Sequence, residues 1–322
     1  MLDVVWLVLG LILLYYGAEW LVAGAAGLAR SLGVSSLVVG LTVVAYGTSA
    51  PEAVVGIEAA LTDRPEIVLG NVIGSNIANI ALILGLTALI SPPQVDAALP
   101  RREVPMLVAA ALTLPLVLID GYVARWEGAL LLVASVVYTV WMVRASRRDV
   151  AEAREAAAVT EEAADQAGAP HATRRWKLIA MAAAGLGGLV VGGSLFVDGA
   201  SGIARTFGMS ERLVGLTIVA VGTSLPELAT SLIAAVRGHS DIAVGNVIGS
   251  NIFNVLLCLG AAATLMPIAG SLGTRVMDLA VLGAVTVVAA VLMRTARKIN
   301  RVEGGLLVGG YVAYLTALAI TA

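Results

Sequence analysis

A glutamate that directly follows a proline occurs in two nearly identical stretches of the chain. The first stretch reads GLTVVAYGTSAPE and ends at Glu52, and the second reads GLTIVAVGTSLPE and ends at Glu227, 175 residues later. The surrounding residues are apolar enough to lie in lipid, where a carboxylate costs at least about 2.5–3.5 kcal/mol. An acid placed there twice, in the same local sequence, indicates one polar site built from two halves of the chain.

The proline in each stretch should break the helix beside the glutamate. Pro51 has no N–H for the carbonyl of Gly47, and its ring crowds the preceding turn. Non-helical backbone at membrane depth is tolerated only where it lines a cavity or is buried in protein. We therefore expect carbonyl, hydroxyl and carboxylate oxygens to gather at each break. The expected donors are Ala45, Thr48, Ser49 and Glu52 in the first half and Ala220, Thr223, Ser224 and Glu227 in the second.

A second duplicated motif supplies polar side chains at helical spacing. GNVIGSNIAN places Asn71, Ser75 and Asn79 four residues apart, on one face of a helix, and GNVIGSNIFN repeats the pattern with Asn246, Ser250 and Asn254. The G-x-x-x-G spacing in each motif lets another helix backbone approach closely. Asn71 and Asn246 are either ligands or helix–helix hydrogen-bond partners. Asn76 and Asn251 lie off the stripe, and we expect them to be structural.

The donor set favours a hard cation. Carboxylates, amides, hydroxyls and carbonyls suit Ca²⁺, Na⁺, Mg²⁺ or Mn²⁺ and offer nothing to soft metals. Two carboxylates balance one Ca²⁺ or two Na⁺, and an empty site with two negative charges is costly to carry across a membrane. The two carboxylates can balance only one of these loads at a time, so competition between Ca²⁺ and Na⁺ for the cavity is a physical basis for exchange. Ca²⁺ ranks above Mg²⁺, because Mg²⁺ gives up its water reluctantly.

The composition predicts a protein embedded in a membrane. Hydrophobic residues make up 59% of the 322 residues and charged residues 13%, and the net charge is −2. The sequence has no stripe of basic residues of the kind that would indicate a nucleic-acid partner. Cys258 is the single cysteine, which excludes a disulfide framework or a thiolate metal cluster and suggests a small residue in a packed helix. We expect the N-terminus to be a first membrane helix and not a cleaved signal peptide.

We expect an all-α polytopic membrane protein with ten transmembrane helices, arranged as two inverted five-helix repeats. A span needs about 20 mostly apolar residues, and an odd number of spans in each half inverts the second half relative to the first. The predicted spans are 4–28, 36–61, 67–90, 104–119, 126–143, 177–204, 213–236, 242–266, 277–293 and 304–321.

The basic residues predict the orientation. With the N-terminus outside, the outer loops hold only Arg64, Arg125, Arg205, Arg212 and Arg275 of the 20 basic residues, and the inner loops hold the rest. The hydrophilic linker 144–176 would then be cytoplasmic, between a first repeat (1–143) and a second repeat (177–322). We expect this linker to be partly helical and solvated. A regulatory Ca²⁺-binding role is the alternative, although its acids lack the glycine turn and alternate-residue spacing of a calcium loop.

Other polar residues in the spans carry weaker signals. Glu58 lies near the outer end of its span, and an interfacial or pathway role suits it better than that of a ligand. Glu19 and Asp198 are not duplicated and are lesser candidates for the ion path. His171 and His239 fall in the linker and in a loop, which removes the usual imidazole proton relay.

The duplicated GTS-x-PE and GNVIGSNI-x-N motifs resemble the two alpha repeats of the cation/calcium exchanger superfamily, specifically of the prokaryotic sodium/calcium exchangers. The resemblance covers essentially all ten predicted spans. It implies an antiporter in the cell (inner) membrane that expels Ca²⁺ in exchange for Na⁺, with no enzymatic activity, no cofactor, and a monomer as its expected form.

Matching motif positions imply roles for the site residues. Glu52 and Glu227 would be the central Ca²⁺ ligands, together with the carbonyls of Thr48 and Thr223. The resemblance places the Na⁺ sites at Ala45, Thr48, Ser75, Ala220, Thr223 and Ser250, with Asn79 and Asn254 lining the middle. Some relatives, including potassium-dependent ones, carry Asp where this chain has Asn254. That departure argues against potassium dependence and leaves the Na⁺ stoichiometry open.

Three rival functions remain at this stage. A proton-coupled Ca²⁺ antiporter is the first, because the two glutamates could themselves carry protons. A cation channel with the carboxylates as a selectivity ring is the second. An intramembrane enzyme is the weakest, since no His, Cys or metal-ligating pair of that kind accompanies Glu52 or Glu227.

Overall fold

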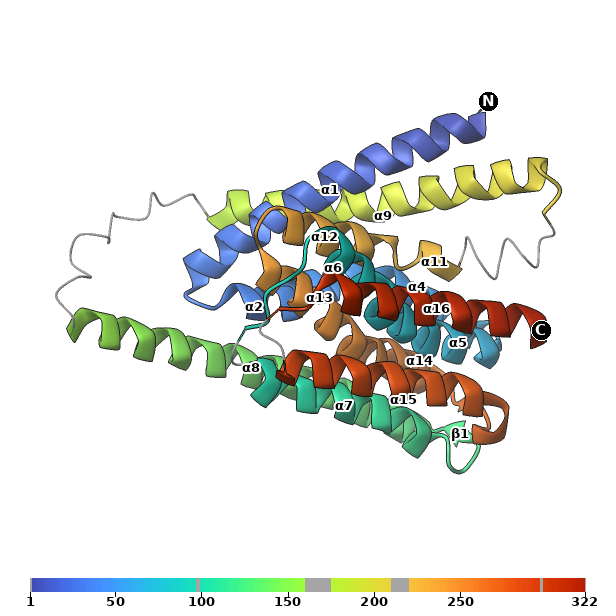
Figure 1. Cartoon of the computed structure of the whole chain (residues 1–322). Coiled ribbons are helices and arrows are strands. Elements are labelled where there is room, and N and C mark those ends of the chain that lie inside the picture. Colours follow the sequence, from blue (N-terminus) through green and yellow to red (C-terminus); the bar gives the residue numbers. More distant parts are fainter. Residues whose placement is uncertain (1, 97–98, 160–174, 210–219, 296–297, 322) are drawn as a thin grey trace.

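The chain folds as a bundle of helices that run roughly along one common direction (Figure 1). The computed structural model describes residues 2–96, 99–159, 175–209, 220–295 and 298–321. In chain order, with η marking π-helical segments, the elements are α1 (Leu2–Leu32), α2 (Ser36–Val39), η1 (Gly40–Val44), α3 (Ala45–Thr48), α4 (Ala50–Leu61), α5 (Pro65–Ile77), η2 (Ala78–Leu84), α6 (Gly85–Ile90), α7 (Leu99–Val117), β1 (Tyr122–Val123), α8 (Arg125–Val159), α9 (Arg175–Thr206), α11 (Ala220–Gly222), α12 (Leu225–Val236), α13 (Ser240–Phe253), η5 (Asn254–Leu259), α14 (Gly260–Leu265), β2 (Ile268–Ala269), α15 (Leu272–Thr295) and α16 (Arg301–Thr321).

The helices have the length and apolarity of a multi-pass membrane protein. Within the described residues, six helical segments are long and apolar enough to cross a membrane, or seven if the bent pair Ser36–Thr48 and Ala50–Leu61 counts as one span. The predicted span 213–236 lies partly outside the described residues, and α12 covers its second part. The single small sheet pairs β1 with β2 antiparallel and joins two loops at one end of the bundle.

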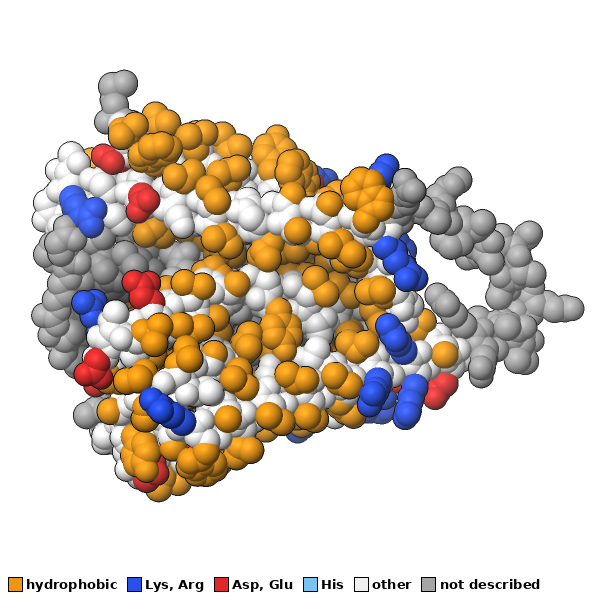
Figure 2. Space-filling model, turned by 180° about the vertical axis from the view of Figure 1, so that it is seen from behind, with side chains coloured by type: hydrophobic (Ala, Val, Ile, Leu, Met, Phe, Trp, Pro, Cys, Tyr) orange, Lys and Arg blue, Asp and Glu red, His pale blue; other side chains and the backbone are white. Residues whose placement is uncertain are grey.

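The surface between the two ends of the bundle is predominantly apolar. Figure 2 shows hydrophobic side chains spread over this region, and Trp20, Trp126 and Trp176 are each at least half exposed. Lys and Arg gather at the end where α8 ends and α9 begins, and Asp and Glu predominate at the other end (Figure 2). An exposed apolar girdle between two charged ends is the surface expected of a protein surrounded by lipid.

Helices α1 and α9 lie side by side and run in opposite directions (Figure 1). Their contact is made by glycines: a β-carbon on Gly17 would lie 2.8 Å from the carbonyl oxygen of Gly185, and one on Gly185 would lie 2.4 Å from the backbone nitrogen of Leu21. Small residues allow such close backbone approach between membrane helices. The two helices occupy corresponding places in the two halves of the sequence.

The local structure recurs with the 175-residue offset of the sequence. Helix α4 (Ala50–Leu61) corresponds to α12 (Leu225–Val236), and α6 (Gly85–Ile90) corresponds to α14 (Gly260–Leu265), residue for residue. The π-helical segments η2 and η5 also coincide to within one residue. Similar sequence therefore gives the same breaks and the same helices twice.

Helix α8 extends beyond the expected end of the fifth span. It continues without interruption to Val159, so the first part of the predicted linker is helical. Residues 160–174, with the remaining linker acids and His171, lie outside the described residues.

The α1–α9 contact gives a prediction with a matched control two residues away. Gly185→Ala should destabilise the protein by about 1–3 kcal/mol, because its methyl group would meet the backbone of α1. Gly187→Ala should leave stability unchanged or slightly higher, since nothing lies within 4 Å of a β-carbon there and Ala favours helix over Gly by about 1 kcal/mol. Thermal unfolding in detergent measures both. Equal stability of the two variants would contradict the assigned packing.

Candidate functional site

The helix breaks at both predicted positions. Ser49 separates α3 from α4 with φ −81° and ψ 3°, and Ser224 precedes α12 with φ −90° and ψ 8°. The first break bends the helix by 43°. Pro51 and Pro226 each lie in the first turn of the helix that follows, where the missing N–H costs no hydrogen bond. The breaks thus begin a new helix at each glutamate.

Each glutamate is held by a serine from the other half of the chain. The hydroxyl of Ser49 donates to Oε1 of Glu227 at 3.2 Å, and the hydroxyl of Ser224 donates to Oε1 of Glu52 at 3.2 Å. Glu52 is 1% exposed and Glu227 is fully buried. The two breaks therefore face each other in the interior, and the predicted union of the two halves is present in the geometry.

Both carboxylates keep one oxygen for a further partner. Oε2 of Glu52 and Oε2 of Glu227 are buried and accept no hydrogen bond from the described residues. A buried carboxylate oxygen that lacks a donor carries a desolvation penalty that a cation would relieve. No group of three or more His, Cys, Asp or Glu side chains in the described residues could hold a metal ion.

The equivalent amides Asn71 and Asn246 bind the backbone of the glutamates. Nδ2 of Asn71 donates to the carbonyl of Glu52 at 3.0 Å, and Nδ2 of Asn246 donates to the carbonyl of Glu227 at 3.3 Å. Asn246 also accepts the hydroxyl of Thr48 at 3.0 Å. Of the two roles left open by the sequence, the structure gives both amides the helix–helix hydrogen bond.

The rest of the polar stripe is buried and largely unsatisfied. Both polar atoms of the Asn79 side chain and the hydroxyl of Ser250 have no hydrogen-bond partner among the described residues. Asn254 is fully buried and its Nδ2 has none either. Asn79 lies in η2, and Asn254 begins η5. A π-helical turn changes the direction of the side chains after it and often marks a functional site.

The off-stripe amides are buried as well. Asn76 and Asn251 are each 2% exposed, and Nδ2 of Asn251 donates to the carbonyl of Val247 within its own helix at 2.7 Å. This local hydrogen bond fits the structural role expected for Asn251.

The carbonyl of Ala45 is not released as the sequence suggested. It accepts the N–H of Ser49 at 3.0 Å and, more weakly, the hydroxyl of Thr48 at 3.5 Å. In the second half the N–H of Ser224 donates to Val221, so the tighter turn there bypasses Ala220. Ala45 retains a second lone pair for a cation, but the break alone does not free its carbonyl.

The duplicated glycine motif is used differently in the two halves. A β-carbon on Gly245 would lie 2.7 Å from the carbonyl of Leu37, and one on Gly249 would lie 2.6 Å from that of Leu41. Those glycines make the predicted close approach. Gly70 has only an arginine side-chain atom at 3.9 Å and Gly74 has nothing within 4 Å. The expected close approach is therefore wrong for the first half, where the space in front of the motif is open.

That open space is a cavity of about 500 Å³. It reaches Ser75 and Thr223, which are candidate donors from opposite halves. Thr223 is half-buried, whereas its counterpart Thr48 is fully buried. The remaining wall includes Asn71, Gly70 and Gly74 from α5 and side chains of α4, α15 and α16. The cavity therefore extends from two candidate donors toward the end of the bundle where α5 begins, and its wall does not include Glu52 or Glu227.

Aromatic packing occupies the corresponding position on the other side of the site. The ring of Tyr46 lies 3.8 Å from that of Phe253, centroid to centroid, and Phe253 is fully buried. The hydroxyl of Tyr46 is hydrogen-bonded to Ser135 and Thr139 of α8 at 2.8 and 2.9 Å. Tyr138 packs on Phe253 from the same helix. The side of the site nearer the α8–α9 end is thus closed.

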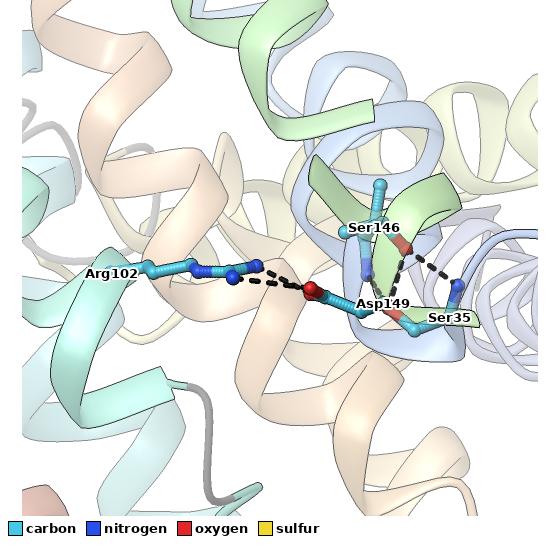
Figure 3. Close-up of polar contacts among 5 residues, drawn as sticks. Ser35, Arg102, Ser146 and Asp149 are labelled. Atoms are coloured by element: carbon cyan, nitrogen blue, oxygen red, sulfur yellow. Dashed lines mark hydrogen bonds and ion pairs between the residues drawn. The ribbon is translucent and has the colours of Figure 1, made fainter. Parts of the chain in front are cut away.

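Polar contacts fix the start of the broken helix to α8 at that closed end (Figure 3). The N–H of Ser35 donates to the hydroxyl of Ser146 at 2.9 Å, and Ser35 also caps α2 by accepting the N–H of Val38. One turn further on, Asp149 accepts hydrogen bonds from Arg102 of α7. These contacts hold α2, α7 and α8 together below the aromatic packing.

Sequence reasoning missed two residues at the site. The thiol of Cys258 points to the carbonyl of Ser49 at 3.7 Å and to Oδ1 of Asn254 at 3.6 Å, so this buried cysteine touches both the first break and the second stripe. Ser231 accepts a hydrogen bond from Asn246 at 3.0 Å. Neither residue is duplicated, since Ile83 and Gly56 stand at the equivalent positions, and the repeat gave no signal for them.

The lesser candidates lie away from the glutamates. Glu58 and Asp198 are exposed, and Glu19 forms an ion pair with Arg237. His239 stands at the start of α13. None of these residues joins the cluster around Glu52 and Glu227 in the described structure.

Comparison with known proteins places these features in one family. The model of the sodium/calcium exchanger protein family matches the chain twice, at residues 2–144 and 177–320. CaxA of Alkalimonas amylolytica, described as a candidate antiporter, is 40% identical over 313 residues and covers 96% of both chains. The sodium/calcium exchanger MaX1 of Methanosarcina acetivorans is 31% identical over 356 residues, with 97% of each chain covered.

The fold agrees with that of a solved relative. The sodium–calcium exchanger NCX_Mj superposes with a TM-score of 0.83 at 34% identity, over 99% of both chains. The family model, the relatives aligned over nearly their whole length and the fold all agree. The chain belongs to the sodium/calcium exchanger protein family.

Proposed function

We propose that this protein is an antiporter that exports Ca²⁺ in exchange for Na⁺ across the cell membrane. The observation that carries the proposal is the pair of crossed hydrogen bonds from Ser49 to Glu227 and from Ser224 to Glu52. They set two buried carboxylates side by side in one site, each with its second oxygen unpartnered. The names of MaX1 and NCX_Mj, which are sodium/calcium exchangers, support the same pair of ions.

The charge of the site explains why transport would be an exchange. Two ionised glutamates are balanced by one Ca²⁺ or by two Na⁺, whereas the unbalanced pair in a low-dielectric interior carries a penalty of several kcal/mol per charge. Because the empty site is costly to reorient, one ion would leave only when another replaces it. The neutral oxygens of Ser75, Thr223, Ser250, Asn79 and Asn254 would complete the shell around either ion, as hard cations prefer.

The asymmetry of access suggests how the ions would move. In this conformation the cavity leads to Ser75 and Thr223 from one end, while Tyr46 and Phe253 close the other. Alternating access would open the aromatic packing and close the cavity. Ten spans in two inverted repeats would relate these two arrangements by an approximate two-fold axis in the membrane plane, and the antiparallel α1 and α9 support that arrangement.

The distribution of basic residues supports the orientation of the protein. Exposed Arg144, Arg147, Arg148, Arg175 and Lys177 lie at the α8–α9 end, on both sides of the linker. The positive-inside rule would place this end in the cytoplasm and the N-terminus outside. The open cavity would then face the exterior.

Uptake of ⁴⁵Ca²⁺ into proteoliposomes tests the function. Vesicles loaded with Na⁺ are compared with vesicles loaded with K⁺ or choline at matched pH. Uptake that requires internal Na⁺ supports the proposal. Uptake driven by a pH gradient without Na⁺ would replace it with proton-coupled antiport, and uptake that needs no counter-ion would indicate a channel.

The first prediction concerns the glutamates. Glu52→Gln or Glu227→Gln should lower Ca²⁺ affinity more than about 100-fold and abolish measurable exchange, because losing one of two buried charged partners costs about 3–5 kcal/mol. Glu58→Gln serves as the matched control, since Glu58 is an exposed acid on α4, the same helix as Glu52. Wild-type flux in either site variant would remove the site assignment.

A second prediction concerns the crossed serines. Ser49→Ala or Ser224→Ala should weaken Ca²⁺ binding about tenfold or more, because a hydrogen bond to a charged group contributes about 1.5–3 kcal/mol. Ser201→Ala should change little, since this buried hydroxyl has no partner among the described residues. Binding of ⁴⁵Ca²⁺ to purified protein measures all three. Equal affinities across the set would show that the serines do not position the carboxylates.

A third prediction concerns the middle of the site. Asn254→Asp adds a third carboxylate beside Glu52 and Glu227, so one further monovalent cation would be needed to balance the charge. The Na⁺ or K⁺ dependence of Ca²⁺ flux should change more than the melting temperature measured with the cation bound, because a bound cation balances the added buried charge. An unchanged Na⁺ and K⁺ profile would argue against a role for this position in ion coupling.

A further inference from the structure

An arginine lies in the wall of the cavity that leads to the cation site. Arg275, near the start of α15, lines the same space as Ser75 and Thr223, and its side chain is only 11% exposed. Its Nη1 lies 3.9 Å from the position of a β-carbon on Gly70. A fixed positive charge on an access path for cations opposes their entry, so its presence needs a physical account.

Two acids accompany this arginine. Arg275 forms an ion pair with Glu66 of α5 and also donates to the carbonyl of that residue at 3.3 Å. Asp278, one turn along α15, lies 4.0 Å from Nη1 of Arg275 and accepts the hydroxyl of Tyr314 at 2.8 Å. The three charges sum to −1, so the guanidinium cancels half of the negative charge that the two carboxylates would otherwise place at the mouth of the cavity.

Arg275 has no arginine at the equivalent position of the first half. The residue that corresponds to Asp278 is Glu103, which also accepts a tyrosine hydroxyl, that of Tyr138. The residue that corresponds to Arg275 is Pro100. The acid–tyrosine pair is thus common to both halves. The other half has its arginine beside the acid, at Arg102, which pairs with Asp149 instead.

We infer that Arg275 sets the cation affinity of the site from the open face, by partly neutralising Glu66 and Asp278 and so weakening the attraction of cations into the cavity. The inference rests on the proposed function. Five residues of α5 separate Gly70 from Ser75, about 7.5 Å along the helix, so the guanidinium lies on the order of 10 Å from the cation site. At that distance, with a dielectric between those of a protein surface and water, one unit charge changes the affinity for a monovalent cation about threefold.

The valence of the ion gives the inference a distinctive signature. A change in local potential acts on Ca²⁺ with twice the energy that it exerts on Na⁺, so the fold-change for Ca²⁺ is the square of that for Na⁺. Removing the positive charge should therefore increase Ca²⁺ affinity about tenfold where Na⁺ affinity increases about threefold. Salt should suppress both effects, because the Debye length falls from about 30 Å at 0.01 M to about 3 Å at 1 M ionic strength.

Equilibrium binding of ⁴⁵Ca²⁺ to the purified full-length protein, with competition by Na⁺, tests this at low and high choline chloride. Arg275→Gln should lower the Kd for Ca²⁺ about tenfold and the half-saturating Na⁺ concentration about threefold at low ionic strength, and much less at high ionic strength. Arg275→Lys should resemble wild type. Arg125→Gln is the matched control, an exposed arginine at the same end of the bundle that is absent from the cavity wall.

Two further variants separate charge from structure. Arg275→Gln combined with Asp278→Asn restores the net charge of the cluster without restoring the ion pair, so its affinities should return close to wild type. Glu66→Gln removes an acid that is 76% exposed and should weaken Ca²⁺ binding, the opposite direction. This variant tests the charge effect independently of whether Arg275→Gln folds.

The outcomes distinguish this inference from the proposed function. Wild-type protein that binds no Ca²⁺ would overturn the proposed function and this inference with it. Na⁺-competed Ca²⁺ binding in wild type would leave the function standing. In that case, affinities that do not move in Arg275→Gln and Glu66→Gln, or that move equally for both ions and regardless of salt, would overturn the inference alone.

Discussion

Two carboxylates buried in the middle of a lipid-facing protein constrain everything around them. Glu52 and Glu227 are buried, and within the described residues each accepts a hydrogen bond from a serine of the other half. Neither half could hold its own glutamate in this way. The helix breaks present the serines, and the amides of Asn71 and Asn246 hold the backbone of the same glutamates in place. The site therefore exists only where the two repeats meet.

Conformation and chemistry are linked through this shared site. Because each carboxylate is bound by the opposite half, any movement of one half relative to the other alters the surroundings of both charges. A cation that bridges the two remaining oxygens would favour arrangements in which the halves stay together. A ligand shifts such an equilibrium only through its different affinity for the two arrangements, and a charge-limited site supplies that difference between loaded and empty states.

The sequence was sufficient to predict the helix breaks and the polar residues of the site. It did not predict the π-helical turns, the packing of Cys258 or which end of the site is open. The duplicated proline, glutamate and amide positions predicted both breaks and the meeting of the halves, because these depend on local chemistry that each repeat carries with it. The π-helical turns at Asn79 and Asn254 follow no periodicity that can be read from the residues. Cys258 reaches the site through tertiary packing alone, and the carbonyl of Ala45 keeps its ordinary helical hydrogen bond from the N–H of Ser49 although the helix breaks there.

The differences between the repeats explain which end is open. If the two repeats had identical sequences, the same side chains would pack at both ends of the site, and neither end would be favoured to close. Here Tyr46 and Phe253 fill one side, whereas Val221 and Ala78 stand at the equivalent positions on the other. On the side without this aromatic pair, the motif glycines Gly70 and Gly74 line the cavity and are open instead of packed. The same glycine spacing can thus line a cavity or accept a neighbouring helix, so closing the cavity requires no new contact surface, only the packing that Gly245 and Gly249 already show in the other half.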